Sequence, residues 1–135
     1  KVIHNAPNTT SNINSKSISK DGGVCIYRGS VVIGEKAEGA KSNVSCESLM
    51  LDEQSQSDTI PAIVIKNDNV DLGHEAKIGR ISDEAIFYLM SRGLSEDEAR
   101  AMLVRGFVEP VSKALPLEYA VEMNNLINLE LKGSM

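Results

Sequence analysis

The chain has 135 residues, of which 41% are hydrophobic, 24% charged and 4% aromatic, and its formal net charge is −5. An acidic chain so poor in aromatic residues lacks the basic surface and stacking side chains of nucleic-acid binders. Its apolar runs are far shorter than the roughly 20 residues that a membrane-spanning helix needs. Two cysteines are too few for a disulfide framework, which favours a reduced, cytosolic setting. The size suits one globular domain or a piece of a larger protein, and a start at Lys1 in polar sequence favours the piece.

Residues 1–79 are rich in Ser, Asn, Thr, Gly and Val, with short apolar clusters between turn-like stretches, as is typical of strands. The β-branched residues Val31, Val32 and Ile33 run together rather than alternate, which suits strands covered on both faces or packed into a narrow interior. A parallel β-solenoid is one such arrangement. The predicted strands are Val24–Arg28, Ser30–Ile33, Asn43–Leu51, Ala62–Ile65 and Val70–Lys77.

In the C-terminal part the apolar residues recur at helical spacing. Ser82 can cap a helix that ends at Gly93. Ser95 and Glu98 have the spacing of a capping box and begin a second helix, which Gly106 closes or bends.

A further short helix is predicted over residues 107–115, because Pro110 is tolerated only near a helix start. Pro116 opens the last helix, and Gly133 ends it. Short amphipathic helices of this kind can bury a modest core against the end of the strand region, or they can present their apolar stripes to another protein.

The side chains with metal-ligand or nucleophile chemistry form no close-spaced motif, so a closed zinc site is not predicted. They are His4, Cys25, Cys46 and His74. Cys46 and Glu75 are 29 residues apart, and one turn of a strand solenoid of about two to three dozen residues would stack such positions on neighbouring turns. A thiolate, the His74 imidazole and a carboxylate could then meet on one face and bind iron or zinc, or the thiolate could act as a nucleophile.

Each of these residues also has a structural explanation. A cysteine in an apolar strand, such as Cys46 or Cys25, is most often a small buried hydrophobic residue. His74 before a charged residue is typical of an edge histidine, and Glu75 alone of a solvated carboxylate. A hydrolase acting through Cys46 and His74 is disfavoured, because no orienting third group or oxyanion element can be named.

Several segments occur in the order in which one protein family carries them: SKSISK, YRG, C-x-S-L-x-L, D-x-x-S-x-S-D-T-x-P, HEA, FYLMSRGLSE-x-EA and LP-x-EYAVE-x-N-x-L. On these segments, which cover nearly the whole chain, the sequence resembles the SufB/SufD family of iron–sulfur cluster assembly scaffold proteins. Cys46 and His74-Glu75-Ala76 reproduce elements of the C-terminal part of its SufB branch.

The resemblance implies a mainly β fold with added helices. The end coils of a right-handed parallel β-helix would occupy residues 1–80, and a small C-terminal helical domain residues 81–135. It implies a scaffold rather than an enzyme, on which a transient iron–sulfur cluster is assembled. By position, Cys46 and Glu75 match the proposed metal ligands, and His74 is a plausible contributor.

The resemblance also implies partners. The SufC ATPase would dock on the helical domain, and SufD or a second SufB would pair through the β-helix, in the cytoplasm or, in a plant or alga, in the plastid stroma. The other hypothesis is an interaction module for SufC and SufD without site chemistry, in which Cys46 is buried and inert. In both cases the residues expected to contact the ATPase are Ile86, Leu89, Met90, Met102, Leu103 and Phe107.

Overall fold

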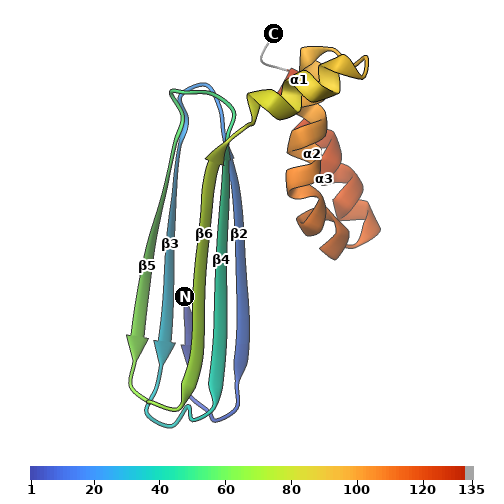
Figure 1. The fold of residues 1–135 in the computed structure, drawn as a ribbon. Coiled ribbons are helices and arrows are strands. Elements are labelled where there is room, and N and C mark those ends of the chain that lie inside the picture. Colours follow the sequence, from blue (N-terminus) through green and yellow to red (C-terminus); the bar gives the residue numbers. More distant parts are fainter. Residues whose placement is uncertain (133–135) are drawn as a thin grey trace. The chain divides into compact units, whose positions relative to one another are not determined.

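The protein consists of two compact units, which are described separately. The structure is a computed structural model and describes residues 1–132 (Figure 1). The first unit, Lys1–Arg80, contains the strands, and the second begins at Ile81 and contains the helices.

Within residues 1–132, six strands form two parallel sheets of three strands each. The strand orders are β1-β3-β5 and β2-β4-β6, so consecutive strands alternate between the sheets. Figure 1 shows that β3 and β5 run in the direction opposite to β2, β4 and β6. This arrangement is compatible with the coils of a β-helix. The bounds are Val2–His4 for β1, Thr10–Ser19 for β2, Val24–Ile33 for β3, Ala40–Met50 for β4, Gln56–Ile65 for β5 and Val70–Arg80 for β6.

The core of the first unit lies between the two sheets, because alternate side chains of each strand point to opposite faces. Hydroxyl groups also point inward: Ser11 and Ser42 are 2.9 Å apart, and Ser17 and Ser48 are 2.6 Å apart, each pair between neighbouring strands β2 and β4. The first pair lies between the levels of Ala40 and Val44, and the second lies beyond Cys46. The buried apolar cluster comprises Val31, Ile33, Ala37, Ala40, Val44 and Cys46.

The strand predictions were incomplete at the N-terminal end. The sequence predicts no strand before Val24, whereas the structure has β1 and β2 there. The inward positions of β2 are mostly serines, and their burial is stabilised by hydroxyl pairs with β4 rather than by apolar side chains, so hydrophobic patterning misses this strand. The two strands predicted on either side of Gly29 form one continuous strand, β3. β5 begins at Gln56, well before the predicted Ala62.

The second unit consists of α1 (Asp83–Ser91), α2 (Glu96–Ala114) and α3 (Leu117–Lys132). The predicted caps are confirmed: the Ser82 hydroxyl accepts a hydrogen bond from the Ala85 amide at 3.2 Å, and Ser95 and Glu98 form a reciprocal capping box. The predicted end of the last helix at Gly133 lies outside the described residues.

α2 is continuous through Gly106 and Pro110, so the prediction of a break and of a separate helix over residues 107–115 was wrong. A proline inside a helix costs about 3 kcal/mol, because it lacks an amide hydrogen and crowds the carbonyl four residues earlier. That carbonyl belongs to Gly106, which has no side chain to add to the crowding. Val104 and Val108 are buried on the same helix, and their burial offsets the cost of the proline.

Candidate functional site

Cys46 lies on the inner face of β4, and its side chain is part of the buried core. It is 4% exposed and is a free thiol. The strands that flank β4 in its sheet place Ser15 of β2 and Ala76 of β6 at the same level. The thiol is therefore enclosed by two small side chains within its own sheet.

Glu75 lies on the opposite face of the sheet from Cys46. The residue of β6 that pairs with Cys46 is Ala76, and Glu75 pairs with Ser45, whose side chain points outward. The Glu75 side chain is 59% exposed, and its carboxylate forms an ion pair of 3.0 Å with Lys77. The hydrogen bond and the charge of Glu75 raise the pKa of Lys77. The expectation that Cys46 and Glu75 meet on one face was wrong, because neighbouring coils repeat after 30 residues here, not 29.

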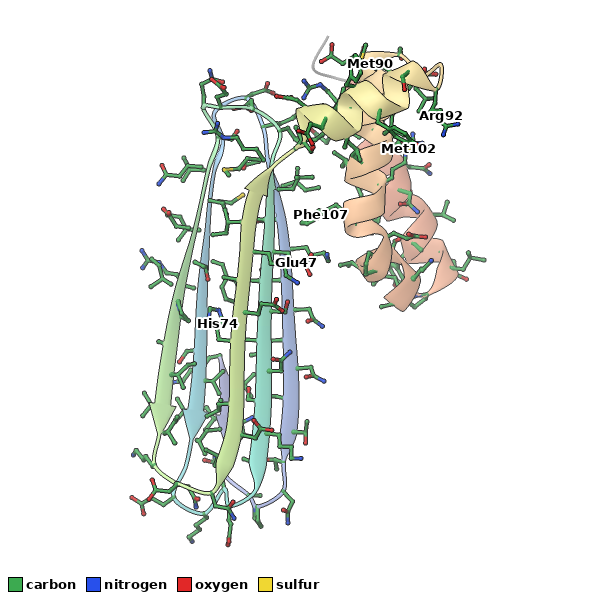
Figure 2. All side chains as sticks on the ribbon, viewed as in Figure 1. Glu47, His74, Met90, Arg92, Met102 and Phe107 are labelled. Carbon is green, nitrogen blue, oxygen red and sulfur yellow. The ribbon has the colours of Figure 1, made fainter. Side chains whose placement is uncertain are left out.

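His74 shares the inner face with Cys46, one level further along the sheet. It pairs with Val44, and in Figure 2 it lies between the sheets, whereas Glu47 lies on the outer side of its sheet. The imidazole lines a small cavity of about 10 Å³ together with Tyr27, Gly29 and Val44. The structure thus brings a buried thiol and an exposed imidazole onto the inward-pointing face of one sheet and excludes Glu75 from that face.

The other sulfur and imidazole groups have structural surroundings. His4 is buried, with its Nδ1 2.6 Å from the Thr9 hydroxyl and its Nε2 2.9 Å from the Ser11 hydroxyl. Cys25 is partly buried, and its thiol lies 3.8 Å from the Ile18 carbonyl oxygen. Among residues 1–132, no three His, Cys, Asp or Glu side chains lie close enough together to hold a metal ion.

Tyr27 and Thr59 face Cys46 from the other sheet. The hydroxyl groups of Ser57 on β5 and Ser48 on β4 are 2.7 Å apart across the interior. Because the two sheets run in opposite directions, the next inward residues from this contact are Thr59 and Cys46. Tyr27 of β3 pairs with Thr59 and so lies at the same level. Burial, and then the charge of Cys46, raise the pKa of Tyr27.

The sequence analysis did not select Tyr27 and Thr59 as site residues. The signal available was that each belongs to a segment of the family pattern, Tyr27 to YRG and Thr59 to D-x-x-S-x-S-D-T-x-P. Hydroxyl residues are common in strands, and only the facing of the two sheets distinguishes these two from the others.

Each three-stranded sheet has two outer strands, and one of the two comes from the C-terminal end of the strand region. β5 and β6 are the outer strands there. The inward-facing side chains of Ile63, Ile65 and Ile78 on these strands are 41%, 50% and 43% exposed. Unpaired strands with exposed apolar side chains are suited to pairing with another chain.

The residues of the helical unit that were predicted to contact a partner lie partly in its core and partly on its surface. Ile86 is buried at 5% exposure and contributes to the core of the unit. Leu89, Leu103 and Phe107 are half-buried. Met90 and Met102 are 42% and 52% exposed, and both are labelled in Figure 2. The methionines are therefore the most accessible of the residues expected to contact a partner.

α2 and α3 also line a cleft of about 1010 Å³. The Arg105 guanidinium spans the two helices, donating from Nε at 3.0 Å and from Nη2 at 2.7 Å to the side-chain oxygen of Asn128. The lining mixes apolar and charged residues, among them Leu94, Met102, Leu131, Asp97, Glu109 and Lys113.

No helix of the described residues is long and apolar enough to cross a membrane.

The fold and the site define a protein with two parallel sheets that enclose a buried thiol, followed in the chain by a helical unit. The chain belongs to the family described as SUF system FeS cluster assembly, SufBD core domain, whose model matches residues 1–107. This confirms the resemblance seen in the sequence.

Three similar proteins come from bacteria. The chain is 60% identical over 135 residues to the iron–sulfur cluster assembly protein SufB of Bacillus subtilis and to an iron–sulfur cluster assembly SufBD family protein of Staphylococcus saprophyticus. It is 59% identical over the same length to a SufBD family protein of Staphylococcus aureus. All of this chain is covered in each case, but it spans only 29% of the length of these relatives.

Proposed function

We propose that this chain is the part of an iron–sulfur cluster assembly scaffold on which a transient cluster is built at Cys46. The cluster is the cargo of the protein, and the scaffold itself catalyses no ATP hydrolysis. Membership of the SufBD family supports the general role. The observation that carries the proposal is the free Cys46 thiol on β4, one strand away from the unpaired edge of its sheet.

The donor set suits a cluster that must be released again. One thiolate supplemented by an imidazole or a carboxylate holds iron less tightly than four thiolates do. Cys46 can supply the thiolate, and His74 lies on the same inner face. Glu75, on the outer face of the edge strand β6, can join only if β6 moves or if the cluster reaches around the edge.

The first unit, in this proposal, is the end of a right-handed parallel β-helix that pairs with a SufD-like protein or with a second copy of SufB. The alternation of parallel strands between two sheets supports the β-helix. The exposed inward-facing side chains of Ile63, Ile65 and Ile78 support pairing at the β5 and β6 edges, because a partner strand would cover them. Such pairing would also shield the exposed His74 side chain on β6 from water.

The second unit, in this proposal, docks an ATPase subunit of the SufC kind. The exposed side chains of Met90 and Met102 and the cleft between α2 and α3 support a protein contact there. Cys46 can act as a thiolate ligand only while it stays reduced, which is consistent with a cytoplasmic or stromal setting.

The test is anaerobic reconstitution of the whole protein with its ATPase and scaffold partners, followed by the visible absorption of the cluster and by iron analysis. Cys46→Ser should abolish cluster formation. Cys25→Ser is the matched control and should assemble normally, because Cys25 faces a different level of the interior. Normal assembly by Cys46→Ser would refute the site.

The same assay separates the two candidate co-ligands. His74→Ala and Glu75→Gln are compared, with circular dichroism to check that each folds. Loss of assembly with Glu75→Gln alone would mean that β6 rearranges during assembly, whereas loss with His74→Ala alone would place the cluster between the sheets. Normal assembly by both variants would leave Cys46 without a co-ligand from this chain and would refute this part of the proposal.

The second candidate function is an interaction module without site chemistry, and the burial of Cys46 favours it. It predicts that a thiol reagent does not label Cys46 in the whole protein, whether or not the partners and ATP are present. Labelling that rises when ATP and the ATPase are added would exclude this alternative.

A further inference from the structure

Three segments of the family pattern meet in one layer of the interior. YRG contributes Tyr27, C-x-S contributes Cys46, and the S-D-T segment contributes Thr59. These residues come from β3, β4 and β5, which are distant in sequence and are brought together by the facing of the two sheets. In this layer the Thr59 and Tyr27 side chains face the strand that carries Cys46.

Thr59 has an unusual hydroxyl. Its Oγ1 is buried and has no hydrogen-bond partner, and it is the one side-chain nitrogen or oxygen of the described residues with that property. A buried hydroxyl without a partner is unfavourable, so such groups are rare in folded proteins unless something binds them. Thr59 opposes Cys46 directly, because it follows Ser57, whose hydroxyl is 2.7 Å from that of Ser48.

Tyr27 is held in place by the residue two positions further on. A Cβ atom at Gly29 would lie 2.6 Å from the Tyr27 hydroxyl oxygen and 2.7 Å from its Cε1, so the ring rests on the glycine backbone. The ring also packs against the buried cluster that contains Cys46 and Val44. The phenol therefore lies between the level of Cys46 and that of His74, and lines the small cavity there.

A sulfur atom that carries charge in such an interior needs hydrogen-bond donors. Thiolates that ligate iron, and the sulfides of a cluster, are stabilised by donors that do not themselves bind the metal. Thr59 and Tyr27 are the residues of the other sheet at the level of Cys46, and the Tyr27 hydroxyl lies toward Gly29, at the next level.

We propose that Thr59, assisted by Tyr27, is a positioning residue that donates a hydrogen bond to the sulfur held at Cys46. The inference rests on the proposed function for its biological meaning. Its structural basis is the buried, unpartnered Thr59 hydroxyl at the level of Cys46 in the facing sheet.

The experiment measures alkylation of Cys46 in the whole, metal-free protein by iodoacetamide at one fixed pH, with mass spectrometry to identify the labelled peptide. Hydrogen exchange of the β4 amides corrects each rate for opening of the buried site. Thr59→Val keeps the shape and removes the donor, so it should slow the corrected rate about tenfold, equivalent to about 1.4 kcal/mol. Tyr27→Phe should slow it less, and Thr59→Ser should restore it.

Thr10→Val, an exposed threonine of β2, is the control and should leave the rate unchanged. A wild-type rate in both Thr59→Val and Tyr27→Phe would overturn the inference, whatever the result for cluster assembly. Slow labelling in Thr59→Ser as well would also overturn it, because a lost hydroxyl would then not be the cause. The Cys46→Ser assembly result bears on the proposed function alone, so the two failures are distinguishable.

Discussion

Replacing Gly29 by alanine should destabilise the strand region measurably, because the Tyr27 ring occupies the place of the new methyl group. The added Cβ would lie 2.6, 2.7 and 2.9 Å from the hydroxyl oxygen, Cε1 and Cζ of Tyr27. Carbon atoms in favourable contact are about 3.5–4.0 Å apart, so the ring must move by about 1 Å within a packed interior. Overpacking of this kind costs about 1–3 kcal/mol.

The lower entropy of the unfolded chain with alanine partly offsets this loss of stability. Alanine restricts the unfolded chain more than glycine does, which stabilises the folded state by about 0.4–1 kcal/mol where no contact is strained. The net loss expected for Gly29→Ala is therefore about 1–2 kcal/mol. Gly79→Ala is the matched control on β6: a Cβ there meets no atom within 4 Å, so this variant should be neutral or slightly more stable.

The assay is hydrogen exchange with mass spectrometry on peptides that cover β3 and β4 in the whole protein, which reports the free energy of local opening. A double-mutant cycle identifies the cause. Leucine lacks the ring atoms that approach Gly29, so Gly29→Ala should cost little in a Tyr27→Leu background. Equal effects of Gly29→Ala and Gly79→Ala, or an unchanged cost in the Tyr27→Leu background, would refute the proposed position of the ring.

Two further predictions concern the helix cap and the strand edge. Ser95→Ala should destabilise α2 by about 1 kcal/mol, measured by hydrogen exchange of its first turns. Hydrogen bonds from Ser95 hold the pKa of Glu98 below its ordinary value, so the wild-type cap should stabilise α2 fully above the ordinary Glu pKa. That contribution should be lost as the pH falls through the lowered folded-state pKa, and a pH-independent difference between wild type and Ser95→Ala would contradict the reasoning. Ile63→Ser should weaken binding of the scaffold partner by about tenfold in a titration, whereas Val64→Ser, equally exposed but outward-facing, should change it little; equal losses would argue against edge pairing.

The helical starts were predictable because each depends on a few adjacent residues. Ser82 and Ser95 accept hydrogen bonds from amide groups of the following turn, and Glu98 accepts one from the Ser95 amide, so no distant contact is needed to specify these starts. The continuity of α2 through Pro110 was not predictable in this way, because it depends on burial of Val104 and Val108 against other helices. Helix propensity gives the free-energy cost of the proline, but it does not include the tertiary packing that offsets this cost.

The strands show the same division. Strands with runs of β-branched residues, such as Ser30–Ile33, were recognisable from the sequence, although their bounds were not. β2 was missed, because its inward side chains are mostly hydroxyl groups that form hydrogen bonds with distant residues, as Ser17 does with Ser48, 31 residues further along the chain. The contacts that stabilise this strand therefore cannot be recognised from its own segment of the sequence.

The candidate site depends on a difference of one residue in the length of a coil. Positions 29 residues apart were expected to stack, but the pairing of Cys46 with Ala76 makes the interval 30, and one residue of offset moves a side chain to the opposite face of a strand. His74 therefore comes to the inner face and Glu75 to the outer one. A cluster held by Cys46 and His74 needs only separation of the two sheets, whereas one held by Cys46 and Glu75 needs β6 to twist or to leave β4. Because β6 is an outer strand with a free edge, a partner that pairs with that edge is well placed to control either movement.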